Sequence, residues 1–183
     1  MKNLSKIIAA ATFAVASLFT ANTVSAQSTT PANAWRFGIG VEAGVPTGDL
    51  KDYSNFALGG TARLQYGINN STAFTLTSGY YNFFAKTYSS TIGNVTYSQK
   101  GQDIGMVPVK AGIKAYTGSG FYVGGEVGAG FETNSGGSTK LILSPGVGYS
   151  WTNVDLGVRY ENYSGQNFNY GMVAARLAYG FKL

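Results

Sequence analysis

The sequence predicts an all-β fold, an eight-stranded antiparallel up-and-down barrel. Large apolar side chains alternate with small or charged ones in eight segments, and a period of two is the pattern of a strand with two different faces. The connections between these segments alternate in length, as they do when strands run up and down in sequence order. No apolar stripe with helical spacing follows residue 26.

Composition excludes several classes of protein. The chain of 183 residues contains neither Cys nor His, which excludes a disulfide scaffold, a Cys/His metal site and His-based acid–base catalysis. Charged residues make up 11% of the chain, against about 25% in an ordinary soluble domain. Glycine contributes 26 residues, about twice its usual share. We expect no catalytic residue, no cofactor and no metal site.

The first 26 residues have the pattern of a secretory signal peptide. Lys2 and Lys6 precede an apolar stretch over 7–19, and small residues end the segment at Ala26. The apolar stretch is too short for a membrane-spanning helix, so we expect cleavage after Ala26. The remaining chain has 11 basic and 8 acidic residues, and this net charge of +3 is too small to favour nucleic acid.

After cleavage, a short N-terminal segment (27–34) is expected to lead into the barrel domain (35–183). Most predicted strands are close to the roughly 9–11 residues that a tilted strand needs to cross a bilayer. The short connections contain turn-forming residues, as in Asn69-Asn70-Ser71. The predicted strands, in chain order, are 35–45, 58–68, 73–82, 104–116, 121–131, 141–151, 154–161 and 171–183.

One face of the predicted strands is apolar, and the other carries the charges and most of the glycines. In 171–183, Val173, Leu177 and Tyr179 oppose Arg176 and Lys182. A soluble barrel would expose a polar face dense in Lys, Glu and Thr. A glycine-rich, sparsely charged face fits the narrow interior of a closed barrel whose apolar face meets lipid. The sequence therefore predicts a transmembrane β-barrel, with a soluble lipocalin-like barrel as the alternative.

Aromatic residues gather at both ends of the apolar face, where interfacial girdles form in membrane barrels. Ordinary strand propensity is the competing explanation. At the end with the long connections they are Phe56, Tyr80, Phe131 and Tyr160. At the end with the short turns they are Trp35, Phe37, Tyr66, Phe74, Phe121, Tyr149, Trp151, Tyr179 and Phe181.

With its eight segments and alternating final strand, the chain resembles the small outer-membrane β-barrel family represented by OmpX and the membrane domain of OmpA. The resemblance covers essentially all of 35–183. It implies a location in the outer membrane of a Gram-negative envelope, with outer-membrane lipid as a partner. In that family the C-terminal strand is the signal for the barrel-assembly machinery and usually ends in an aromatic residue. Here the chain ends in Leu183, with Phe181 two residues earlier.

Charges on the inward face form the principal candidate site. An eight-stranded barrel is just wide enough for side chains to fill, and buried charges have to be paired. We expect a salt-bridge network that closes the lumen, with a narrow ion path as the alternative. Its expected members are Glu42, Arg63, Lys110, Lys114, Glu126, Asp155, Arg159 and Arg176.

The longest connection (83–103) mixes aromatic and small polar residues, a composition typical of recognition surfaces. Partial alternation from Thr91 to Ser98 indicates a hairpin beyond the membrane, whose edges would accept a partner's strand. An inert polar cap is equally compatible. We therefore expect a non-enzymatic structural and surface-interaction protein. The alternatives are a small porin-like channel or solute-binding barrel, and, less favoured, a carboxylate-based lipid enzyme.

Overall fold

The computed structural model describes residues 30–93, 95–117, 120–165 and 168–183. The predicted signal segment (1–26) lies outside these residues. The barrel strands are β1 (Trp35–Gly48), β2 (Ser54–Gly67), β3 (Thr72–Ala85), β6 (Ile104–Tyr116), β7 (Phe121–Glu132), β8 (Thr139–Ser150), β9 (Val154–Gly165) and β10 (Tyr170–Lys182). The other elements are the 3₁₀ helix η1 (Asp49–Asp52) and the strands β4 (Thr87–Ile92) and β5 (Val95–Lys100).

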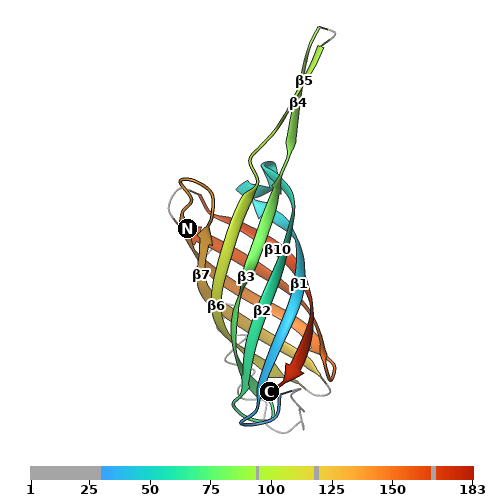
Figure 1. Ribbon diagram of the computed structural model, residues 1–183, viewed down its shortest axis with the longest axis vertical. Helices are drawn as coiled ribbons and strands as arrows, with labels where there is room; N and C mark the ends of the chain where they lie inside the picture. Colours follow the sequence, from blue (N-terminus) through green and yellow to red (C-terminus); the bar gives the residue numbers. More distant parts are fainter. Residues whose placement is uncertain (1–29, 94, 118–119, 166–167) are drawn as a thin grey trace.

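Within the described residues, eight strands form a closed antiparallel barrel in the order β1-β10-β9-β8-β7-β6-β3-β2 (Figure 1). The ring closes because β1 pairs with β10 from Arg36–Lys182 to Gly48–Tyr170. Strands β4 and β5 pair only with each other. The predicted eight-stranded up-and-down barrel is confirmed.

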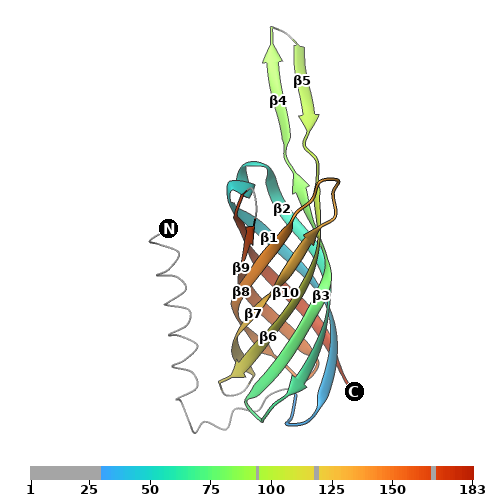
Figure 2. The same ribbon diagram turned by 90° about the vertical axis from the view of Figure 1, so that its left-hand side faces the viewer.

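The two ends of the barrel differ. The β2–β3 and β8–β9 connections lie at one end, which we call the turn end (Figure 2). At the turn end, the Asn69 side chain accepts a hydrogen bond of 2.9 Å from the Ser71 backbone N–H, as expected of an Asx turn. The helix η1, the β4–β5 hairpin and the β7–β8 connection lie at the opposite end, which we call the loop end (Figure 2).

Several strands extend further toward the loop end than the sequence pattern predicted. β1 continues to Gly48 and β9 to Gly165, whereas the alternation indicated ends at residues 45 and 161. In these extensions the inward residues are themselves apolar or aromatic, such as the buried Pro46 and Tyr163, so the polar–apolar contrast that marks a strand in the sequence disappears. The predicted long connection over 46–57 is therefore reduced to η1 and Tyr53.

The barrel has the reverse polarity of a soluble protein. Large apolar side chains such as Val41, Leu76 and Leu177 are exposed on the outside. Lys110 and Glu161, by contrast, have 0% exposure and lie inside. Soluble domains bury apolar residues and leave charges in water. The arrangement is that of a transmembrane β-barrel, as the alternation predicted.

Candidate functional site

The eight charged residues predicted to face inward all lie inside the barrel, and each has an oppositely charged neighbour. They come from six strands and form one connected group with Glu161, here called the lumen network. Its members are Glu42 on β1, Arg63 on β2, Lys110 and Lys114 on β6, Glu126 on β7, Asp155, Arg159 and Glu161 on β9, and Arg176 on β10.

The part of the lumen network nearest the loop end contains two carboxylates, Glu42 and Glu161. Arg159 donates to Glu42, and Lys110 donates to Glu161. Arg159 Nε also lies 2.8 Å from Glu161 Oε1 but is not aligned for a hydrogen bond. The Tyr81 hydroxyl donates to Glu42 Oε2 over 2.8 Å. Each carboxylate therefore receives more than one donor, as burial of its charge requires.

Glu126 occupies the middle of the lumen network. Its Oε1 accepts hydrogen bonds from Arg63 Nη2 at 2.9 Å and from the Thr77 hydroxyl at 2.7 Å. Its Oε2 lies 3.6 Å from Lys110 Nζ and 3.8 Å from Arg159 Nη1. Glu126 thus links the middle of the network to the part nearest the loop end.

Asp155 is the carboxylate nearest the turn end. It accepts hydrogen bonds from Lys114, from the Ser150 hydroxyl at 2.6 Å and from the Tyr122 hydroxyl at 3.0 Å. Arg176 Nη1 lies 3.4 Å from its Oδ1. The Lys114 ammonium also lies 3.8 Å from the centre of the Tyr122 ring, within the range of a cation–π contact.

Glu161 was not among the predicted members, although its position in the strand pattern places it on the charged face. It accepts from Lys110 and from the Tyr163 hydroxyl. Its even spacing from Asp155 and Arg159, six and two residues along the same strand, was the signal that could have included it. The tyrosine donors were also missed, because a hydroxyl at the end of an aromatic ring reads as apolar in an alternation pattern.

An apolar and aromatic cluster fills the lumen toward the loop end, next to the network. The rings of Phe83, Tyr163 and Tyr170 are in mutual contact, with centroid distances of 4.9–6.0 Å. Leu50 of η1 is buried in the same cluster. Met106, Ile142 and Met172 complete the packing. This cluster was not predicted from the sequence.

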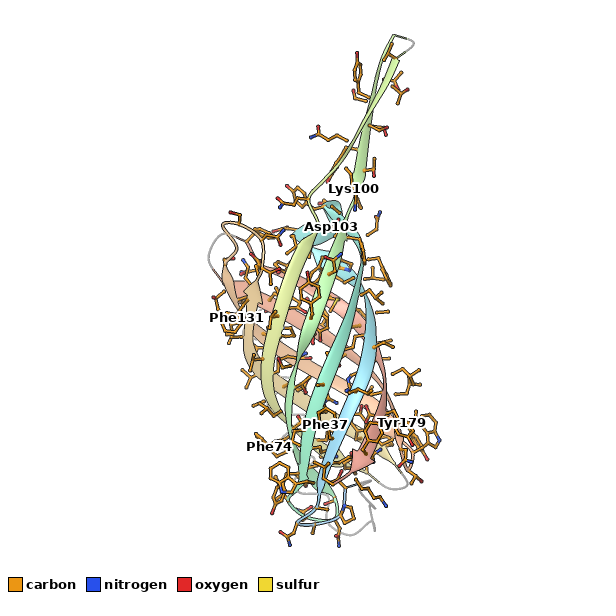
Figure 3. All side chains as sticks on the ribbon, in the orientation of Figure 1. Phe37, Phe74, Lys100, Asp103, Phe131 and Tyr179 are labelled. Atoms are coloured by element: carbon orange, nitrogen blue, oxygen red, sulfur yellow. The ribbon has the colours of Figure 1, made fainter. Side chains whose placement is uncertain are left out.

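The nine aromatic residues predicted to form the turn-end girdle occupy strand ends near the short turns, or positions next to them. In Figure 3 the side chains of Phe37, Phe74 and Tyr179 lie at the turn end, and that of Phe131 lies on the loop-end half. Three pairs of the nine are in ring contact: Trp35–Tyr66, Tyr149–Trp151 and Tyr179–Phe181. Their position at a lipid interface stays a prediction.

The β4–β5 hairpin projects beyond the barrel at the loop end (Figures 1 and 2). Its register places the Ser89–Ser98 and Thr91–Thr96 pairs on one face, where their hydroxyls are 2.8 Å and 3.1 Å apart. Tyr97 lies on the opposite face and is 62% exposed. The hairpin that partial alternation indicated is therefore present.

The base of the hairpin is held by Asp103 (Figure 3). Its carboxylate accepts a hydrogen bond of 2.9 Å from the Ala85 backbone N–H and lies 3.0 Å from Lys100 Nζ. These two contacts, with the backbone N–H the stronger, lower the pKa of the Asp103 carboxyl from its ordinary value. The Tyr88 hydroxyl also donates to the backbone oxygen of Asp52 over 2.7 Å.

No helix in the described part of the chain is long and apolar enough to cross a membrane. In the same residues, no group of His, Cys, Asp and Glu side chains is arranged to hold a metal ion.

No family model matches the sequence, and no curated protein matches it. Solved structures do share the fold. The crystal structure of Ail, the attachment invasion locus protein of Yersinia pestis, has a TM-score of 0.57 and 16% identity, covering 82% of this chain and 99% of that one. The structure of the Yersinia pestis outer membrane protein Ail in a phospholipid bilayer nanodisc has a TM-score of 0.51 and 17% identity, covering 79% and 99%.

The solution structure of the de novo designed TMB2.3 has a TM-score of 0.51 and 15% identity, covering 80% of this chain and 94% of that one. At these identities the likeness concerns the fold alone. The resemblance to small outer-membrane β-barrels is confirmed at that level: the chain has the fold of an outer-membrane β-barrel.

Proposed function

We propose that this chain is a surface-interaction protein of the outer membrane, in which a closed barrel holds the β4–β5 hairpin outside the cell to bind a partner. The observation that carries the proposal is the hairpin itself. It extends past the barrel, and its outer strand edges pair with nothing in the described part of the chain. Open edges accept a further strand from a partner, so we expect a protein partner. Ail, similar in fold, is by name an attachment protein.

Removal of the hairpin tests this role. The backbone N–H of Gly101 donates to the oxygen of Lys86 over 3.0 Å, so a short Gly-Ser turn in place of 87–100 joins two neighbouring points. Labelled protein in nanodiscs would be tested on an array of serum and cell-surface proteins. We expect the deletion to abolish the binding seen with the wild type while leaving the barrel folded.

A matched pair of substitutions sharpens the experiment. Tyr97→Ser removes an exposed ring from the hairpin, and Tyr53→Ser removes a ring of similar exposure, 61%, outside it. We expect only Tyr97→Ser to weaken binding. Equal binding by the wild type and the hairpin deletion would refute the role.

We also propose that the barrel is closed to ions and acts as an anchor. The lumen network and the aromatic cluster of Phe83, Tyr163 and Tyr170 support closure, because both occupy the interior. In planar bilayers we expect no unitary conductance. Stable, voltage-sensitive openings would favour the alternative of a small channel.

Insertion by the barrel-assembly machinery is proposed to use β10, whose outward face ends in Tyr179 and Phe181. Phe181→Ser is expected to slow assembly in vesicles that contain this machinery, without slowing folding into detergent. Equal slowing in both would indicate an effect on the barrel itself.

A further inference from the structure

Two cavities inside the barrel have several cations in their walls. Their volumes are about 40 Å³ and about 20 Å³. Arg63, Lys114 and Arg176 line both of them. The other charged lining residues are Arg159 and Glu126 at the larger cavity and Arg36 and Asp155 at the smaller one. Each cavity therefore has four cations and one carboxylate in its wall.

The lumen network as a whole has one more base than acid among the described residues. Its bases are Arg63, Lys110, Lys114, Arg159 and Arg176, and its acids are Glu42, Glu126, Asp155 and Glu161. A buried charge without a counter-charge is costly. These nine residues therefore carry one positive charge that no carboxylate of the network offsets, and Arg36 adds a further cation to the wall of the smaller cavity.

Arg176 is the residue at which this excess is located. Its Nε lies 3.2 Å from Glu42 Oε1, but Glu42 is also paired with Arg159. Its Nη1 lies 3.4 Å from Asp155 Oδ1, but Asp155 is also paired with Lys114. Its Nη2 is buried and has no hydrogen-bond partner in the described chain. Arg176 thus shares both of its carboxylates with other bases, and its Nη2 amino group donates to neither of them.

We propose that one small monovalent anion, with chloride as the physiological candidate, binds where the two cavities share Arg176, Arg63 and Lys114 in their walls. One such ion offsets the excess positive charge of the lumen network. The anion also accepts a hydrogen bond from Arg176 Nη2. A water molecule could accept the same hydrogen bond, but it would not supply the negative charge. Because the cavities hold only a few atoms, larger anions are excluded. Gly180 keeps one wall open: a Cβ there would lie 2.1 Å from Arg36 Nε.

Crystals of the wild-type barrel grown with bromide in place of chloride give a direct test. We expect an anomalous scattering peak inside the lumen, in contact with Arg176 Nη2. Lumen density without an anomalous signal, or bromide peaks confined to the outer surface, would show that water fills the cavities and would overturn the proposal.

The folding equilibrium gives a second test in solution. At constant ionic strength, chloride at ten times its Kd raises the folding equilibrium constant about elevenfold relative to gluconate. Arg176→Gln is expected to remove this dependence on chloride. Lys51→Gln removes the same charge from the exposed surface of η1, outside the lumen network and both cavities, so the dependence is expected to persist.

Persistence in Arg176→Gln, or loss in both variants, would contradict the site. If Arg176→Gln fails to fold, the bromide experiment on the wild type decides.

Discussion

At the scale of single residues, each carboxylate of the lumen network serves several donors, so its loss affects more than one partner. Glu161 is the clearest case, because Lys110, Arg159 and Tyr163 all surround it. Glu161→Gln leaves two buried cations without this counter-charge. We expect destabilisation of about 3–5 kcal/mol, measured by urea unfolding of the folded barrel in lipid vesicles.

Asp52→Asn is the matched control for Glu161→Gln. Asp52 is an exposed carboxylate of η1, outside the lumen, and its substitution is expected to change stability by at most about 0.5 kcal/mol. Equal effects of the two variants would show that the lumen network does not stabilise the barrel.

The hairpin base is expected to depend on pH through Asp103. Its pKa is lowered in the folded protein, chiefly by the Ala85 N–H and then by Lys100. The stabilisation is therefore complete above the ordinary pKa of an aspartate and is lost as the pH falls through the lowered value. The amide NMR signal of Ala85 should report this transition, and Asp103→Asn should abolish it. An unchanged titration in Asp103→Asn would assign the transition to another group.

At the scale of the strand, two neighbouring glycines of β2 differ in the space available for a side chain. A Cβ at Gly59 would lie 2.1 Å from the Tyr81 ring, whereas one at Gly60 would meet nothing within 4 Å. Gly59→Ala is expected to destabilise the barrel by about 1–3 kcal/mol through overpacking. Gly60→Ala should have a smaller effect or none. Thermal unfolding of both in the same detergent checks this, and equal shifts would contradict it.

The outward face of β10 is expected to respond to charge according to depth. Leu177 lies in the middle of the strand, paired with Val41 and Leu156, whereas Leu183 follows its end. Leu177→Lys should cost about 2–4 kcal/mol in a bilayer, and Leu183→Lys about 0–1 kcal/mol. Folding titrations in lipid vesicles measure both. A similar cost at the two positions would argue against a lipid-facing belt.

The strands themselves were predictable because lipid outside and packed charges inside require apolar and polar or small residues to alternate along each strand. Their ends at the loop side were not, since Gly48 and Gly165 lie where that contrast has faded. Alternation also placed Glu42 and Arg159 on the inner face without pairing them. Their contact joins β1 to β9, the two strands that flank β10, and such pairs depend on the stagger around the ring, which a local pattern does not contain.

At the scale of the whole molecule, closure and the filled interior give one cooperative unit. A closed barrel keeps its backbone hydrogen bonds out of reach of water and detergent. We expect the folded protein to migrate faster than the boiled protein in a detergent gel, and to fractionate with membranes. Identical migration together with a soluble location would favour the lipocalin-like alternative.

The seam between β1 and β10 also constrains how the chain is made. It joins Arg36 to Lys182, so ring formation waits until the two most distant strands of the fold are both available. Contacts of such long sequence separation form slowly. Every intermediate before closure exposes apolar side chains and backbone N–H and C=O groups that have no hydrogen-bond partner. Chaperones therefore have to bind the unclosed polypeptide in an extended state, and the barrel cannot fold progressively during synthesis on the ribosome.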